Sequence, residues 1–138
     1  MKTKHSLLFF WTLLVTPLIS LSHGMEAPGP HKGAIKMPGP FHTEVTKIKE
    51  GKFRVYLLDM DFRNPRIKDS SVEATVVGKT ETKLDCQPDE YDLSFVCSGY
   101  PTSVKSGQLH IKANRAGAIG NTAVYDLPLN IPKMKKTH

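Results

Sequence analysis

The sequence predicts an all-β protein: an immunoglobulin-like antiparallel β-sandwich of about seven strands, after a signal peptide and a Pro/Gly-rich arm. Two observations support this prediction. Apolar and polar residues alternate over short β-branched stretches, and turn residues interrupt these stretches at a spacing of roughly 8–12 residues. No convincing helical period is present. We divide the chain into a signal peptide (1–22), an arm (23–41), a sandwich domain (42–132) and a basic tail (133–138).

The first 22 residues have the features of a secretory signal peptide. Lys2 and Lys4 precede an apolar run at 6–21, which Pro17 interrupts and a small-residue cleavage site follows at 20–22. The run is short for a membrane span, and an uncleaved anchor is the alternative interpretation. We expect export to the periplasm or secretion, with no membrane insertion once the signal peptide is removed.

Seven strands are expected after the arm. Their ranges are 43–48, 52–60, 72–77, 80–86, 91–97, 107–113 and 122–129. Alternate residues of a strand point to opposite faces of its sheet. Leu109 and Ile111 of the sixth strand should therefore face the core, with His110 on the other side. The same alternation places Leu93 and Phe95 of the fifth strand inside.

The chain contains two cysteines, Cys86 and Cys97. In an exported protein an even number of cysteines normally forms disulfides, and turn residues at 88–90 separate these two. We predict a disulfide that ties the two arms of a hairpin and stabilises the fold by roughly 2–3 kcal/mol. The spacing matches neither a Cys-x-x-Cys redox motif nor a zinc pattern.

Composition and motifs argue against two classes of function. The formal charge is +6, and loss of Lys2 and Lys4 with the signal peptide lowers it to +4. Basic and acidic residues are interspersed, a pattern that does not indicate nucleic-acid binding. The sequence has no Gly-x-Ser-x-Gly elbow, His-Glu-x-x-His motif or phosphate-binding glycine loop. We expect a protein that is not an enzyme.

The arm and the start of the first strand contain a candidate set of metal ligands. Thioether sulfur selects cuprous copper, and imidazole suits copper, zinc and nickel. The set is His23, Met25, His31, Met37 and His42. Two similar units, each with a methionine, a Pro-Gly-Pro triplet and a histidine, could close on one copper ion. The alternative is that the two triplets only stiffen the arm.

Two further inferences refine this copper hypothesis. Cleavage after Ser22 would make His23 the mature N-terminus, whose α-amine and imidazole can together chelate Cu(II). Val45 is expected to face the core, so His42 and Glu44 should face outward, where Glu44 could orient a metal-bound His42. A surface His–Glu pair without metal is the alternative interpretation.

The segments "GPHKGAI", "FHTEV" and "FRVYLLD" resemble the Gly-Pro-His-Gly-Gly opening and following strand pair of YtkA-like domains and of domains found with heavy-metal efflux adaptor proteins. The resemblance covers roughly residues 31–59, and Lys32 stands where a second glycine is usual. In architecture the chain is also similar to copper-resistance carriers of the CopC type. The resemblance implies a periplasmic module associated with metal handling, and it carries His31 and His42 over to that role.

The sequence therefore leads to two functional hypotheses. The first is a periplasmic, non-enzymatic copper-binding or carrier protein that uses the histidine and methionine ligands near the arm and hands the ion to an envelope partner such as an efflux component. The alternative is a metal-free interaction module, in which the Pro-Gly-Pro arm wraps the sandwich or docks along the sheet edge of a partner.

Overall fold

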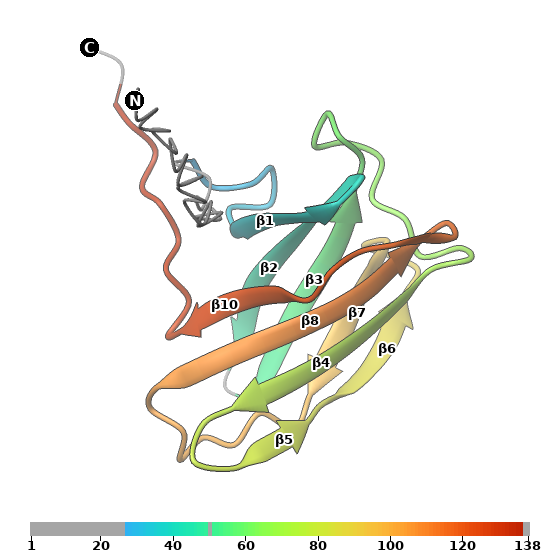
Figure 1. The fold of residues 1–138 in the computed structure, drawn as a ribbon. Coiled ribbons are helices and arrows are strands. Elements are labelled where there is room, and N and C mark those ends of the chain that lie inside the picture. Colours follow the sequence, from blue (N-terminus) through green and yellow to red (C-terminus); the bar gives the residue numbers. More distant parts are fainter. Residues whose placement is uncertain (1–26, 50, 137–138) are drawn as a thin grey trace, which may run out of the picture.

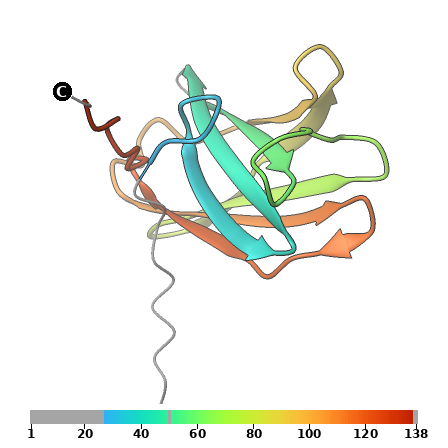
Figure 2. The same ribbon diagram turned by 90° about the horizontal axis from the view of Figure 1, so that it is seen from above.

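In the computed structural model, which describes residues 27–49 and 51–136, the chain forms two antiparallel five-stranded sheets packed as a β-sandwich. Figures 1 and 2 show the two sheets as separate layers. All regular elements of this part of the chain are strands, and none of its segments is a helix long and apolar enough to cross a membrane. The predicted all-β sandwich is confirmed, but these described residues form ten strands rather than about seven.

Each sheet combines strands that are not all consecutive in sequence. The first sheet contains β1 (Ala34–Gly39), β2 (Phe41–Lys49), β3 (Lys52–Leu58), β6 (Asp85–Asp89) and β7 (Ser94–Ser98). The second contains β4 (Ser71–Val77), β5 (Glu81–Lys83), β8 (Gly107–Arg115), β9 (Ala118–Ile119) and β10 (Ala123–Leu127). The strand orders are β1-β2-β3-β7-β6 and β10-β8-β4-β5, with β9 paired to β8.

The additional strands have identifiable causes. β1 lies inside the segment expected to be an arm, and Ala34 pairs with Val45 of β2 until the register shifts around Pro38, which has no N–H to donate. The expected strand at 80–86 becomes two strands, β5 and β6, because the chain passes from one sheet to the other at Leu84. β9 is a two-residue strand that pairs with the end of β8.

The core lies between the sheets and follows the alternation predicted from the sequence. Leu109 and Ile111 of β8 are fully buried, and His110 between them is half-buried on the outer face. Phe95 of β7 is also buried, as expected. The expectation for Leu93 is wrong: its side chain is 43% exposed because it lies in the turn before β7 with a φ of +51°.

One polar contact joins the two sheets inside this apolar core. The Tyr125 hydroxyl of β10 lies 2.6 Å from Oγ1 of Thr43 in β2 and donates to the Thr43 carbonyl oxygen at 2.9 Å. Both residues are buried. Burial raises the pKa of Tyr125, so the phenol stays neutral and can donate. The contact supplies the partners that buried polar groups require.

The predicted disulfide is confirmed. Cys86 of β6 and Cys97 of β7 are directly opposed in the antiparallel pair and form an S–S bond. The bridge therefore joins the outermost strand of the first sheet, β6, to its neighbour.

Candidate functional site

The candidate site begins with the loop at 27–33, which leads into β1. The Gly29 N–H donates to the Gly33 carbonyl oxygen, and the Lys32 N–H donates to the Gly29 carbonyl oxygen, both at 2.9 Å. Lys32 has a left-handed φ of +62°, a conformation that costs roughly 1–2 kcal/mol for a residue with a Cβ. Position 32 is therefore one where glycine would fit without this cost.

The loop closes over the carboxylate of Glu44 in β2, which is fully buried. Oε1 accepts hydrogen bonds from the backbone N–H groups of His31 at 2.8 Å and Gly33 at 2.9 Å. Oε2 lies 2.7 Å from Nδ1 of His31. A buried carboxylate is costly unless it is hydrogen-bonded, and these three donors, all supplied by the loop, satisfy it.

Gly29 and Gly33 make this close approach sterically feasible. A Cβ at position 29 would collide with the Glu44 carboxyl group. At position 33 a Cβ would lie 2.6 Å from the carbonyl oxygen of Val45 and 2.7 Å from Cγ of Glu44. The Gly-x-His-x-Gly spacing of the loop thus has a local explanation: the two glycines admit the carboxylate, and the histidine between them binds it.

The imidazole of His31 is held from two sides. It is stacked on Tyr56 of β3, with ring centroids 3.6 Å apart and an interplanar angle of 4°. Since an ionised carboxylate can only accept, the His31 Nδ1 carries the hydrogen of the bond to Glu44. In the neutral ring this leaves the lone pair on Nε2. The His31 side chain is 33% exposed, so the ring is both fixed and accessible.

Arg54 continues the polar row beyond Tyr56 on the same face of the first sheet. Its Nη1 donates to Asp89 at 2.8 Å and to Ser94 at 2.9 Å, and it lies 2.7 Å from the Asp92 carboxylate. The hydrogen bond from Arg54 lowers the pKa of Asp89, and burial raises the pKa of Tyr56. These contacts fix the β6–β7 turn against the sheet.

His42 lies two residues from Glu44 on the same face of β2 but has different contacts. Its Nδ1 lies 2.9 Å from the Asp59 carbonyl oxygen, and its ring is stacked on Phe62 at 4.1 Å. His42 and Glu44 lie on the face of β2 opposite the core, as predicted. The expectation that this face is exposed to solvent is wrong, because His42 is 3% exposed and Glu44 is fully buried. Loops at 27–33 and 59–64 cover this face. Glu44 was also expected to orient His42, but its carboxylate is hydrogen-bonded to His31 instead.

The other predicted ligands do not gather around His31. Met37 is 57% exposed and lies beside residues 121–124 of the second sheet. His23 and Met25 lie outside the described residues, as does the predicted signal peptide. Within 27–49 and 51–136, no three His, Cys, Asp or Glu side chains are grouped so as to hold a metal ion. The structure brings together His31 and Glu44 and separates both from Met37.

Tyr56 and Arg54 were not among the site residues predicted from the sequence, although they belong to the polar row that includes His31 and Glu44. Their alternation with Phe53, Val55 and Leu57 is visible in the sequence and places them opposite the core. What the sequence does not contain is the register that pairs Glu44 with Tyr56. With that register, His31, Glu44 and Tyr56 could have been assigned to one site.

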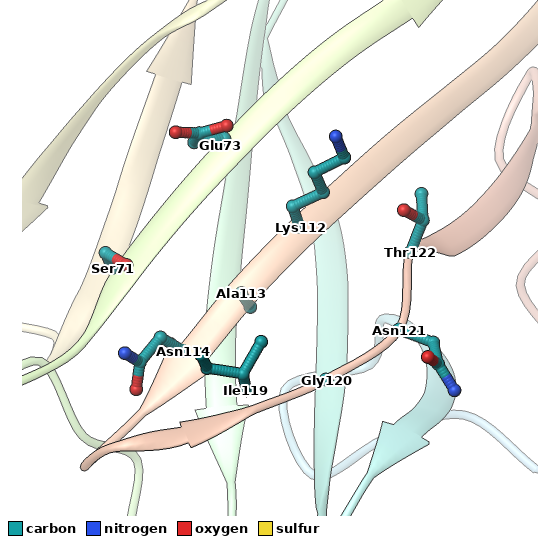
Figure 3. Close-up of a pocket in the computed structure, with 9 residues that line it drawn as sticks. All are labelled: Ser71, Glu73, Lys112, Ala113, Asn114, Ile119, Gly120, Asn121 and Thr122. Carbon is teal, nitrogen blue, oxygen red and sulfur yellow. The ribbon is translucent and has the colours of Figure 1, made fainter.

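The second sheet carries a shallow pocket of about 520 Å³ on its outer face (Figure 3). Figure 3 shows Glu73 of β4 and Lys112 of β8 on adjacent strands, with Asn121 and Thr122 on the segment that leads into β10. The lining contains none of the predicted ligands. We therefore place the candidate site at His31 rather than here.

Comparisons with protein-family models, with curated proteins and with solved structures find no match to this chain. Its function is accordingly argued from the geometry around His31.

Proposed function

We propose that this protein is a non-enzymatic copper-binding or carrier protein in which Nε2 of His31 is the anchoring ligand. The observation that supports the proposal is the 2.7 Å contact between His31 Nδ1 and Glu44 Oε2. Histidines that bind metals usually donate their second ring N–H to a carboxylate or carbonyl group, which fixes the ring and raises its basicity. His31 has this arrangement, and its ring is partly open to solvent.

Additional ligands would come from His23 and Met25, which precede the loop in sequence. A thioether together with imidazole favours copper over harder metals. His42 and Met37 are not part of the proposed site, because the His42 ring is covered by Phe62 and Met37 lies beside the second sheet. An incomplete set of ligands on the folded domain would suit a carrier, since a carrier must release its ion to a partner.

We also propose that the protein works in the periplasm and that its sandwich is a variant of the immunoglobulin-like fold. The Cys86–Cys97 disulfide supports an oxidising compartment. The pairing of β3 with β7 and of β4 with β8 supports the fold, because non-consecutive neighbours of this kind occur in Greek-key sandwiches.

The experiment is a copper titration of the exported protein followed by calorimetry and native mass spectrometry. We expect His31→Gln to weaken copper binding at least tenfold, and Glu44→Gln to weaken it by about 10–100-fold, the usual cost of losing a carboxylate behind a ligand. His110→Gln is the matched control, because His110 lies on a strand and, among the residues that the structure describes, its side chain is hydrogen-bonded to Gln108 alone. Unchanged affinity in His31→Gln would disprove the proposal.

A second function, a metal-free interaction module, is supported by a different observation. The Glu44 carboxylate is fully satisfied by the loop without any ion, and the arm is thereby built into the sheet as β1. In that case the wild-type protein takes up no copper, and His31→Gln lowers only the free energy of unfolding. Measuring both quantities on the same variant separates the two functions.

A further inference from the structure

The turn between β6 and β7 presents an aromatic side chain to solvent at one end of the molecule. Tyr91 is 94% exposed, and the neighbouring Leu93 is 43% exposed. The turn is held in place by the Arg54 contacts and by a hydrogen bond from the Tyr91 N–H to Asp89 Oδ1 at 3.1 Å, and the disulfide joins the two strands of the hairpin further from the turn. Tyrosine is enriched at binding hot spots, and because the backbone of this turn is already held, only the side chain would lose conformational freedom on contact.

The surroundings of Tyr91 are acidic. Asp89, Glu90 and Asp92 flank it in sequence, and Arg54 is the cation among the described residues that pairs with Asp89 and Asp92. These three carboxylates and the one guanidinium together give the β6–β7 turn a net charge of −2. The whole chain, in contrast, carries an excess of positive charge.

A small pocket of about 180 Å³ lies at the other end of the molecule. Tyr100, Val104 and Pro128 form its apolar lining, and Lys47 and Lys105 stand at its sides. Neither lysine forms an ion pair within the described ranges. The volume is below the roughly 300–1,000 Å³ of sites for drug-sized ligands, which favours a single side chain as occupant.

The floor of this pocket is already formed in the isolated chain. The Tyr100 hydroxyl donates to the Val104 carbonyl oxygen at 2.7 Å, and its ring packs edge-on against Phe53 at 5.2 Å. The Tyr100 N–H donates to the Gly51 carbonyl oxygen at 3.2 Å. The pocket therefore needs no rearrangement to accept a partner.

We propose that the protein associates with itself head to tail, with Tyr91 of one copy seated in the Tyr100 pocket of the next. The acidic residues around Tyr91 would meet Lys47 and Lys105, so charge complementarity accompanies the apolar contact. The two surfaces lie at opposite ends of β7 (Figure 1), because the β6–β7 turn precedes Ser94 and Tyr100 of the pocket follows Ser98. A contact between different surfaces of identical chains is heterologous and extends into an open chain unless it closes into a ring.

A contact of this size is weak. One inserted side chain with two flanking ion pairs buries far less than the roughly 1,200–2,000 Å² of a stable interface. We expect association at millimolar rather than micromolar protein concentration, and a several-fold weakening at high ionic strength because the charges are exposed.

The experiment is sedimentation velocity of the disulfide-bonded exported protein, without metal and with a chelator, over this concentration range. Tyr91→Ser and the double variant Lys47→Glu/Lys105→Glu should each weaken association at least tenfold. A 1:1 mixture of the two variants should recover a dimer that grows no further, because one variant supplies the intact pocket and the other the intact β6–β7 turn. Ile119→Ser, which removes another apolar side chain that is 79% exposed, is the control and should associate as the wild type does.

Three results would overturn the proposal: a wild-type protein that stays monomeric at millimolar concentration, a variant that associates normally, or a mixture that stays monomeric. Thermal unfolding of each variant verifies the fold, which should be unaffected because the altered side chains are exposed. The outcome is independent of copper binding at His31, which lies outside both surfaces.

Discussion

The carboxylate of Glu44 determines where the loop before β1 lies. It is buried in β2, and all three of its hydrogen-bond donors come from residues 31 and 33. The loop that takes the carboxylate out of water also supplies the donors that replace its hydration. Without the carboxylate, two loop N–H groups would lack their acceptor. The loop and the side chain therefore stabilise each other.

Gly33→Ala tests how tightly the loop fits over Glu44. The new methyl group would lie 2.6 Å from the Val45 carbonyl oxygen, which cannot move without disturbing β2. We expect the free energy of unfolding to fall by about 1–3 kcal/mol, the range for overpacked sites, measured by urea titration. Gly78→Ala is the control, since its methyl group would meet only ordinary contacts at 3.6 Å and 3.7 Å. Equal stability of the two variants would contradict this account of the loop.

At the level of elements, the β6–β7 hairpin depends on its disulfide. β6 is the outermost strand of its sheet and pairs only with β7. The hydrogen bonds of β6 should therefore open before those of β3. Replacing Cys86 and Cys97 by serine should cost roughly 2–3 kcal/mol, measured by urea unfolding.

Hydrogen exchange locates the effect of this double variant. Backbone amides of β6 should exchange faster, whereas those of β8, in the other sheet, should keep their relative protection. A uniform change in both sheets would show that the disulfide stabilises the fold only globally.

Carboxyl groups in two turns should make the free energy of unfolding depend on pH in the acidic range. Hydrogen bonds from the Arg63 N–H and its neighbours lower the pKa of Asp59, and the hydrogen bond from Arg54 lowers the pKa of Asp89. A carboxyl group with a lowered pKa in the folded state stabilises the protein above its unfolded pKa of about 4 and loses this contribution as the pH falls through the folded value. Stability should therefore decline below about pH 4.

Asp59→Asn and Asp89→Asn should each flatten this decline, measured as the urea midpoint against pH. Asp126→Asn is the control, because the Asp126 side chain is exposed and forms no hydrogen bond or ion pair within the described ranges. A decline that is the same in all three variants would exclude the two turns as its cause.

The strands were predictable from the sequence where one face is buried in the core, because burial of that face makes apolar and polar residues alternate along the strand. The ranges expected from the sequence overlap β2–β8 and β10, and the disulfide followed from two cysteines around a turn. β1 was not predictable in this way, because the carboxylate that anchors its loop belongs to another strand. Leu93 shows a second limit: its place in a turn with positive φ overrides the alternation.

The candidate site was predictable only in part, for a similar reason. The histidines and Glu44 were identified by residue type, but their partners depend on how two loops fold over the sheet. His42 is covered by Phe62, which no local pattern connects to it. His31 and Glu44 meet across 13 positions, a pairing that the register of β1 on β2 establishes.

For the molecule as a whole, Tyr125 is a buried polar link between the two sheets. Tyr125→Phe keeps the ring in the core and removes a hydroxyl with two partners on Thr43. We expect a loss of about 1–2 kcal/mol of unfolding free energy, measured by urea titration. Tyr91→Phe is the matched control and should change stability by less than about 0.5 kcal/mol, since Tyr91 is exposed. If both variants are equally stable, the Tyr125 hydroxyl contributes nothing measurable to holding the sheets together.

The Thr43–Tyr125 contact also has a consequence for the order in which a newly made chain folds. The two residues are 82 positions apart, so most of the chain must be available before this bond can form. A nascent chain that ends before Tyr125 contains β2 and β3 yet lacks the strand that completes the second sheet. Such long-range closure slows folding. The sandwich would therefore remain incompletely folded until Tyr125 has been synthesised.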